Sequence, residues 1–236
     1  MSRLKKEKAH KILGILEELY PVTPVPLDHR DPFTLLVAVL LSAQTTDKKV
    51  NEVTAALFDR APNPRALSQM TVEEIKEYIR QIGLSGSKAK NLHKLAHQLL
   101  EGYNGQVPQT IEEMETLAGV GHKTASVVAA QAFGVPAFPV DTHIHRLAHR
   151  WRLSNGKNVV QTEKDLKAVF PKETWNKVHL QIIFFGREYC PALYHDLSIC
   201  PICSWAAPKA QWKAEERRNR ELRGSRKSKA SRVSIN

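Results

Sequence analysis

The chain has 236 residues, of which 42% are hydrophobic and 25% charged, a balance that is ordinary for a globular protein with an apolar core. Its net charge of +11 is unusual and suggests a polyanionic partner, most simply nucleic acid. The longest apolar run, 35–41, is far shorter than the roughly 20 residues of a membrane-spanning helix, which excludes a membrane protein and predicts a cytoplasmic one.

Apolar residues recur with helical spacing along most of the chain, and no convincing alternation of period two appears. The first predicted helix carries Ile12, Leu16 and Leu19 on one face and ends before Pro21. Further helices are predicted over residues 32–42, 48–58, 72–82, 88–101, 111–117, 123–133, 142–150, 162–170 and 172–185. The pattern therefore predicts an all-α fold.

The C-terminal residues have a different composition. From Lys209 onward there are ten Lys or Arg and three Glu, a net charge of +7, so the other 208 residues carry +4. Apolar residues almost vanish after Trp212. We therefore predict a basic tail over residues 205–236 that is disordered or partly helical.

Two stretches, 81–89 and 117–125, each place a glycine turn before a helix that has a lysine near its start. In the second stretch, Gly119-Val120-Gly121 permits a tight turn and a close approach of the backbone to a partner. The N–H groups at the start of the following helix suit an anion such as a DNA phosphate. A plain helix-to-helix turn with a capping glycine is the alternative.

Two residues near this turn have the chemistry of a catalyst. Lys123 lies in the first turn of the helix, where the helix dipole favours the neutral, nucleophilic amine; the alternative is a surface lysine. Asp141 precedes the next helix, where it is expected to act as an N-cap. A carboxylate held by helix N–H groups is rigid, so a cap and a catalyst are compatible.

Four motifs together resemble the helix–hairpin–helix DNA glycosylase superfamily, and specifically the endonuclease III family. They are the stretches 117–125, Val140-Asp141-Thr142-His143, 41–47 and 156–159. The resemblance covers residues 8–205, and the lysine of the hairpin is similar to that of the bifunctional branch. It implies a two-lobed fold with a C-terminal cysteine loop. One domain would span 22–131 and the other 1–21 plus 132–204, with DNA in the cleft between them.

The resemblance also implies an activity, namely removal of oxidised pyrimidines from damaged double-stranded DNA by a monomer at the nucleoid. Lys123 would attack C1′ of a flipped nucleotide with help from Asp141, and β-elimination would then cut the strand on its 3′ side. Gln44 would fill the gap left by the flipped base, while residues 119–122 would contact the backbone. His122 departs from the family, which commonly has arginine there. The alternatives are a DNA-binding module without catalysis and a glycosylase without lyase activity.

The three cysteines depart from the family as well. Endonuclease III proteins usually hold an iron–sulfur cluster through C-x6-C-x2-C-x5-C, whereas Cys190, Cys200 and Cys203 form C-x9-C-x2-C and Lys209 follows where a fourth cysteine is absent. A [4Fe–4S] cluster with His195 as fourth ligand is one interpretation. A zinc ion bound by the same four residues is the second, and a loop without metal is the third.

Overall fold

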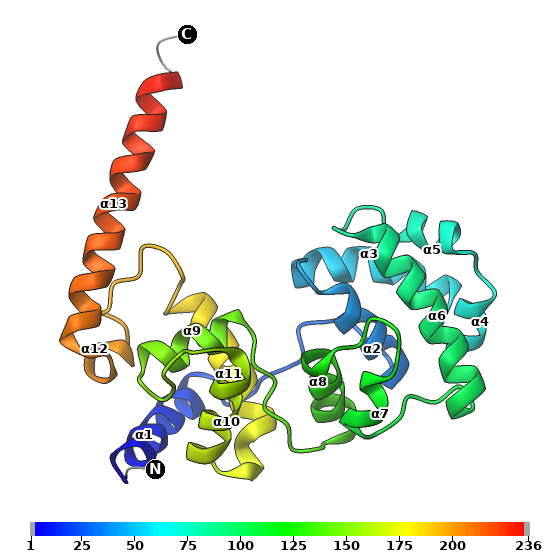
Figure 1. The fold of residues 1–236 in the computed structure, drawn as a ribbon, viewed down its shortest axis with the longest axis horizontal. Helices are drawn as coiled ribbons and strands as arrows, with labels where there is room; N and C mark the ends of the chain where they lie inside the picture. The colour runs from blue at the N-terminus through cyan, green and yellow to red at the C-terminus, as the bar shows by residue number, and fades with distance from the viewer. Residues whose placement is uncertain (1–2, 234–236) are drawn as a thin grey trace. The chain divides into compact units, whose positions relative to one another are not determined.

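The structure is a computed structural model that describes the backbone of residues 3–233 and the side chains of residues 3–222. Every regular element in the described part is a helix, which confirms the predicted all-α fold. The chain divides into two compact units (Figure 1). Unit 1 comprises Met1–Thr23 and Val140–Asn236, and unit 2 comprises Pro24–Pro139. No described helix is long and apolar enough to cross a membrane.

Unit 2 is built around one helix that is buried along almost its whole length. This helix, α2 (Pro32–Leu41), has every residue from Phe33 onward buried, and α3, α6 and α8 pack against it. Asp31 begins it through a capping box, in which its carboxylate accepts a hydrogen bond from Thr34 N at 2.8 Å. The other helices of unit 2 are α3 (Asp47–Arg60), α4 (Pro64–Ser68), α5 (Val72–Tyr78), α6 (Ser85–Tyr103), α7 (Ile111–Glu115) and α8 (His122–Phe133).

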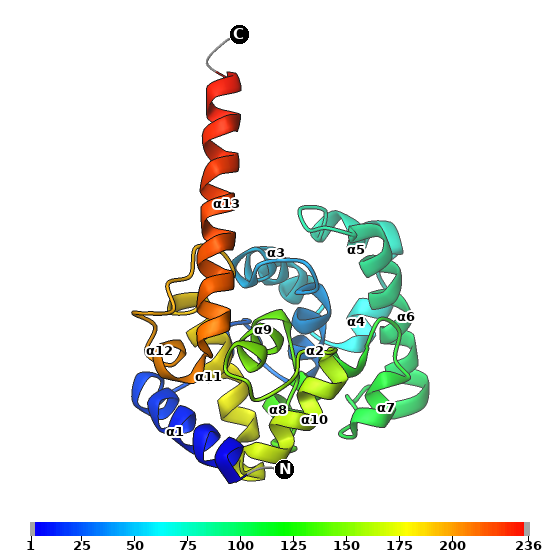
Figure 2. The ribbon, with the colours of Figure 1, turned by 60° about the vertical axis from the view of Figure 1, so that its left-hand side comes forward.

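Unit 1 joins the N-terminal helix to the second half of the chain (Figures 1 and 2). Its helices are α1 (Arg3–Leu19), α9 (Thr142–Arg150), α10 (Val159–Val169), a 3-10 turn η1 (Lys172–Thr174), α11 (Trp175–Glu188), α12 (Cys203–Ala206) and α13 (Lys209–Val233). Helix α11 packs against both α1 and α9. In this core Trp151 is completely buried and meets the ring of Phe185 edge-on at 5.7 Å.

Most predicted helices appear within a few residues of their expected bounds. Their first turns are capped by the residue that directly precedes the helix, so the sequence itself marks where they begin. Residues 142–150 form α9 as predicted. Helix α4 was not predicted, since residues 61–64 indicate only a stop. The expected helix over 172–185 is divided into η1 and α11. The expected domain boundary at residue 131 lies inside α8, and the structure places the division at residues 139 and 140 instead.

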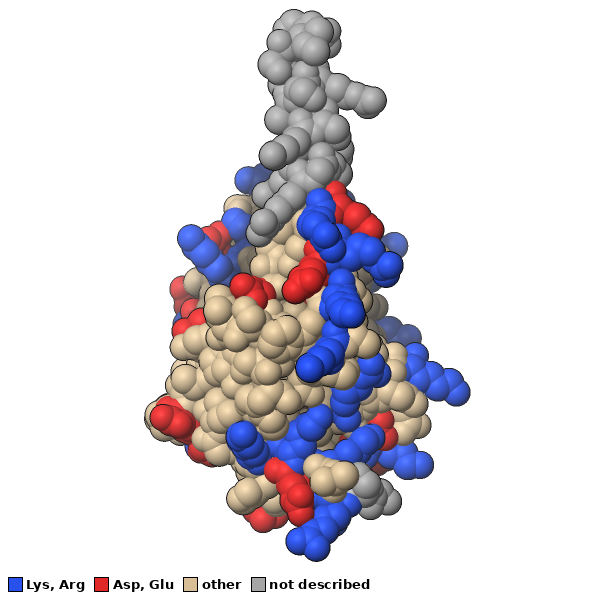
Figure 3. Space-filling model, turned by 90° about the vertical axis from the view of Figure 1, so that its left-hand side faces the viewer, with Lys and Arg blue, Asp and Glu red and all other residues tan. Residues whose placement is uncertain are grey.

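The basic tail predicted over 205–236 is helical rather than disordered where the structure describes it, with α13 running as one continuous helix, and residues 234–236 lie outside the described part (Figures 1 and 2). Its first turns are held by long-range contacts that composition does not reveal. Glu215 forms an ion pair with Arg150 at 2.8 Å, with side chains only 13% and 7% exposed, and Asn219 Nδ2 donates to His195 O at 3.0 Å. Five basic residues of α13 are exposed: Lys209, Lys213, Arg217, Arg218 and Arg220. Figure 3 shows Lys and Arg side chains gathered in a band on one face.

We expect Glu215→Ala to lower the free energy of unfolding by about 3 kcal/mol, because it leaves the Arg150 guanidinium buried without its carboxylate. Urea denaturation followed by circular dichroism measures the change. The matched control is Glu221→Ala, an exposed glutamate of the same helix, where the effect should stay within about 0.5 kcal/mol. Equal effects of the two substitutions would contradict the anchoring of α13 by this ion pair.

Candidate functional site

The turn between α7 and α8 contains two glycines, Gly119 and Gly121, which have different structural roles. Gly119 has φ +77°, and a Cβ there would lie 2.7 Å from Asn91 Nδ2, so both conformation and space require glycine. Gly121 is the N-cap of α8 in an extended conformation, and a Cβ there would meet nothing within 4 Å. The space in front of Gly121 is therefore open to the backbone of a partner.

The start of α8 carries no side-chain cap, because Gly121 offers none. Uncapped N–H groups at the positive end of a helix form an anion site. Val120, which was predicted to contact DNA, has a buried side chain, and its N–H bonds to Leu117 O at 3.1 Å. It therefore shapes the turn from inside the core. His122 is exposed, and its Nδ1 lies 2.6 Å from Glu115 Oε1.

Lys123 is the second residue of α8 and is exposed. Among the described residues, no hydrogen bond or ion pair engages its amine. The corresponding lysine of the first hairpin, Lys88, is 5% exposed and has three hydrogen-bond acceptors. The two hairpins look alike in sequence, yet only the second leaves its lysine available for chemistry.

Asp141 is the N-cap of α9, as predicted: its Oδ1 accepts a hydrogen bond from Ile144 N at 2.8 Å. The side chain is partly buried, and the described residues provide no hydrogen bond to Oδ2. Burial lowers the pKa of the neighbouring His143, despite the opposing effect of the Asp141 charge. Asp141 belongs to unit 1 and Lys123 to unit 2.

Gln44 lies in the loop between α2 and α3 with its side chain exposed. Its φ of +58° falls in the left-handed region, which costs a residue with a Cβ about 1 kcal/mol. Such a conformation persists only where the surroundings impose it.

Lys88 supplies that constraint and was not predicted as a site residue. From the start of α6 its Nζ donates to Leu41 O at 2.9 Å, to Ala43 O at 2.7 Å and to Thr45 Oγ1 at 3.2 Å, on both sides of Gln44. Burial lowers the pKa of this amine. The sequence does contain a signal, because Lys88 shares a helix face with buried Leu92, Leu95 and Leu99.

The three cysteines and His195 converge in unit 1. Cys190 follows α11, His195 lies in the next loop, and Cys200 and Cys203 flank the start of α12. All four are buried, and one ligand atom from each lies within 4.8 Å of all the others. A hydrogen bond with Cys190 lowers the pKa of the Cys200 thiol, and the same hydrogen bond raises the pKa of Cys190 to about 11. The group is suited to hold a metal.

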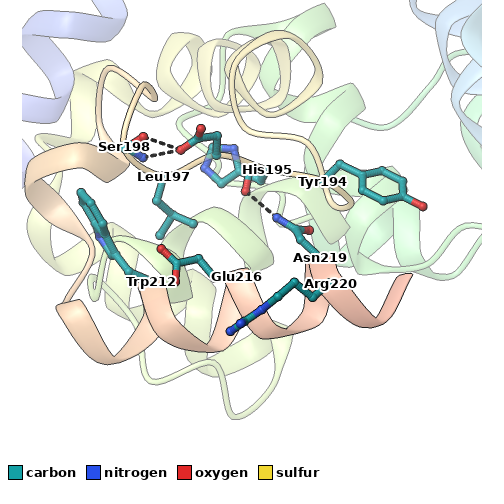
Figure 4. Close-up of a pocket in the computed structure, with 9 residues that line it drawn as sticks. Tyr194, His195, Leu197, Ser198, Trp212, Glu216, Asn219 and Arg220 are labelled. Carbon is teal, nitrogen blue, oxygen red and sulfur yellow. Dashed lines mark hydrogen bonds between the residues drawn. The ribbon is translucent and has the colours of Figure 1, made fainter. Parts of the chain in front are cut away.

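Helix α13 packs beside the loop that carries His195 and leaves a pocket of about 500 Å³ between them (Figure 4). Its lining includes Tyr194 and Leu197 from the loop, and Trp212 and Arg220 from the helix. The pocket is therefore bounded by the loop that carries His195 and is lined by neither Lys123 nor Asp141.

Comparison with known proteins agrees with this arrangement. Residues 37–172 match the model of the HhH-GPD superfamily of base excision DNA repair proteins, and the chain belongs to that superfamily. Endonuclease III of Escherichia coli K12 is 46% identical over 80% of this chain and 90% of its own length. Endonuclease III of Synechocystis is 42% identical over 88% and 94%. Within the superfamily, the protein is a member of the endonuclease III family.

Solved structures of endonuclease III also resemble this chain. An endonuclease III in a non-covalent complex with DNA matches with a TM-score of 0.84 and 40% identity, over 89% of this chain and 98% of that one. A trapped covalent intermediate of endonuclease III with DNA matches equally well. A thermostable thymine-DNA glycosylase, 22% identical with a TM-score of 0.77, shares the fold.

We expect Gln44→Gly to raise the free energy of unfolding by about 1 kcal/mol, because glycine accepts the left-handed conformation without cost. If Gln44 fills the gap left by a flipped base, as the sequence predicts, the same change should lower base release from damaged duplex DNA at least tenfold. Urea denaturation and a single-turnover glycosylase assay measure the two effects.

Leu84→Gly is the matched control. Leu84 has φ +60° and a side chain that is 62% exposed, so it should gain stability without losing activity. If base release falls equally in both variants, Gln44 has no special part in the reaction.

Proposed function

We propose that this protein removes oxidised pyrimidines from double-stranded DNA and then cuts the abasic strand on the 3′ side through a lysine Schiff base. The observation that carries the proposal is the Lys123 amine, which is exposed and uncommitted at the start of α8, directly after a glycine turn with open space before it. Membership of a base excision repair superfamily and the covalent DNA intermediate trapped for a relative support it.

DNA contact begins at the glycine turn. A backbone phosphate would bind the N–H groups at the start of α8, next to Gly119, Gly121 and His122. The damaged nucleotide must leave the helical stack, because C1′ is inaccessible within it. Gln44, presented by the loop that Lys88 holds, would occupy the vacated position.

In the first chemical step, the lone pair of the Lys123 amine forms a bond to C1′ and the glycosidic bond breaks, with its electron pair leaving on the base. The amine must lose a proton as it attacks. The Asp141 carboxylate would accept this proton or stabilise the positive charge that develops on the sugar. Its capping bond to Ile144 N keeps one oxygen fixed and leaves the other for this work.

In the second step, the sugar ring opens and the lysine nitrogen becomes doubly bonded to C1′ as an iminium ion. The cation acidifies the hydrogen at C2′. Loss of that proton forms the C2′–C3′ double bond and expels the 3′ phosphate, so the strand is cut. Water then releases Lys123 and regenerates the enzyme.

Borohydride trapping on abasic duplex DNA tests the lysine directly. The wild-type protein should give a covalent adduct, since borohydride reduces the iminium. Lys123→Ala should lose it, and so should Lys123→Arg, which retains the charge but not the nucleophile. Lys94→Ala is the control, an exposed lysine of α6 in the same unit, and should trap normally.

Two results of this experiment would contradict the proposal. Tight DNA binding without an adduct in the wild type would identify a binding module without catalysis. Base release without strand cleavage would identify a glycosylase without lyase activity.

A separate prediction concerns Glu115, whose carboxylate lies against His122 beside the proposed phosphate site. Glu115→Gln should tighten binding to an abasic-analogue duplex about two- to fivefold, because it removes a negative charge beside the proposed phosphate site. Fluorescence anisotropy at two salt concentrations measures the affinity. Glu112→Gln, an exposed acid of the same helix, is the control; an equal gain there would attribute the effect to net charge alone.

A further inference from the structure

The ligand set in unit 1 differs from the one that a four-iron cluster takes. Such clusters are normally bound by four thiolates, one for each iron. This chain has three cysteines, all of them already in the site, and the fourth nearby donor is the imidazole of His195. The composition of the site is therefore Cys₃His, which is a common ligand set of structural zinc.

The distances between ligand atoms separate the two possibilities. Cys190 Sγ lies 3.7 Å from Cys203 Sγ and 3.4 Å from His195 Nε2. A tetrahedral zinc ion, with Zn–S bonds of about 2.3 Å and a Zn–N bond of about 2.0 Å, places two sulfur ligands about 3.7 Å apart and a sulfur and a nitrogen about 3.5 Å apart. The observed separations are those of ligands that share one ion.

A four-iron cluster does not fit this arrangement. Its thiolates bind different irons, so an iron–iron edge separates them in addition to the two iron–sulfur bonds. Ligand atoms that all lie within 4.8 Å of one another leave no room for four irons and four sulfides between them. The loop would have to open for a cluster to bind.

The surroundings also suit three thiolates around a single dication, which leave one net negative charge. Arg150 Nη1 donates to Cys190 Sγ at 3.2 Å, and Cys203 N–H donates to Cys200 Sγ at 3.4 Å. Such donors around the ligands stabilise bound thiolates and orient them. On the other side, Asn219 of α13 donates to His195 O and holds the loop that presents the imidazole (Figure 4).

We propose that Cys190, His195, Cys200 and Cys203 bind one zinc ion in place of an iron–sulfur cluster. Four protein ligands leave no open position, so the ion is structural. Zinc has no redox change under biological conditions, so this part of unit 1 neither gains nor loses electrons. The ion joins the end of α11 to the start of α12 and sets the point from which α13 departs.

Metal analysis of the purified full-length protein tests the proposal. Cells are grown with both iron and zinc supplied, the protein is purified without oxygen, and zinc, iron and acid-labile sulfide are measured per chain. We expect about one zinc, no sulfide and no visible absorbance. Iron at a comparable level, with or without sulfide, overturns the proposal, and so does protein free of metal.

Cobalt substitution then tests the ligands. Co²⁺ in the wild-type site should show the visible bands of a tetrahedral sulfur-rich site and be displaced by one equivalent of Zn²⁺. His195→Ala should weaken Zn²⁺ binding at least tenfold and shift those bands, whereas Asp196→Asn should change neither, because Asp196 is engaged with Ser198 on the exposed side of the same loop. An unaltered cobalt spectrum in His195→Ala removes His195 from the site.

Discussion

Burial of α2 is the constraint on which the arrangement of unit 2 depends. A helix that is apolar on nearly every face must be covered on every side, and α3, α6 and α8 provide that cover. This packing sets the position of α8, which presents Lys123, and of the loop after α2, which presents Gln44. The same packing brings Lys88 from α6 to the carbonyl groups at the end of α2. The buried core of unit 2 thus sets the positions of two exposed residues, Lys123 and Gln44.

The two residues that we propose as catalytic, Lys123 and Asp141, both occur at helix starts, but the two helix starts are capped differently. At α8 the cap is a glycine, so the N–H groups stay open for an anion and the adjacent amine stays exposed. At α9 the cap is Asp141 itself, so the N–H groups hold a carboxylate in one orientation. The start of α8 therefore has no side-chain cap, whereas the start of α9 is capped by a carboxylate.

The loop that carries Cys190, His195, Cys200 and Cys203 packs together with α13 in unit 1. Arg150 connects them, because its guanidinium contacts both Cys190 Sγ and the carboxylate of Glu215. Lys209 stands at the position where the family pattern has its fourth cysteine, and it is the first residue of α13. The ion pair between Glu215 and Arg150 anchors this helix. A single ion requires less space than a cluster, which agrees with the close approach of the four ligand atoms, all within 4.8 Å of one another.

The sequence by itself determined the helices, since apolar spacing and caps such as Asp31 and Asp141 act within a few residues. It also predicted a candidate catalytic lysine, Lys123, and a possible metal-binding group of Cys190, His195, Cys200 and Cys203, because residue type and spacing suggest that chemistry. Only the tertiary structure decided that Lys88 is a buried clamp, that Val120 faces the core, that Glu115 engages His122 and that α13 is anchored. It also decided the ligand separations that favour one ion over a cluster. Each of these depends on atoms that packing brings together, and local propensity does not specify such distances.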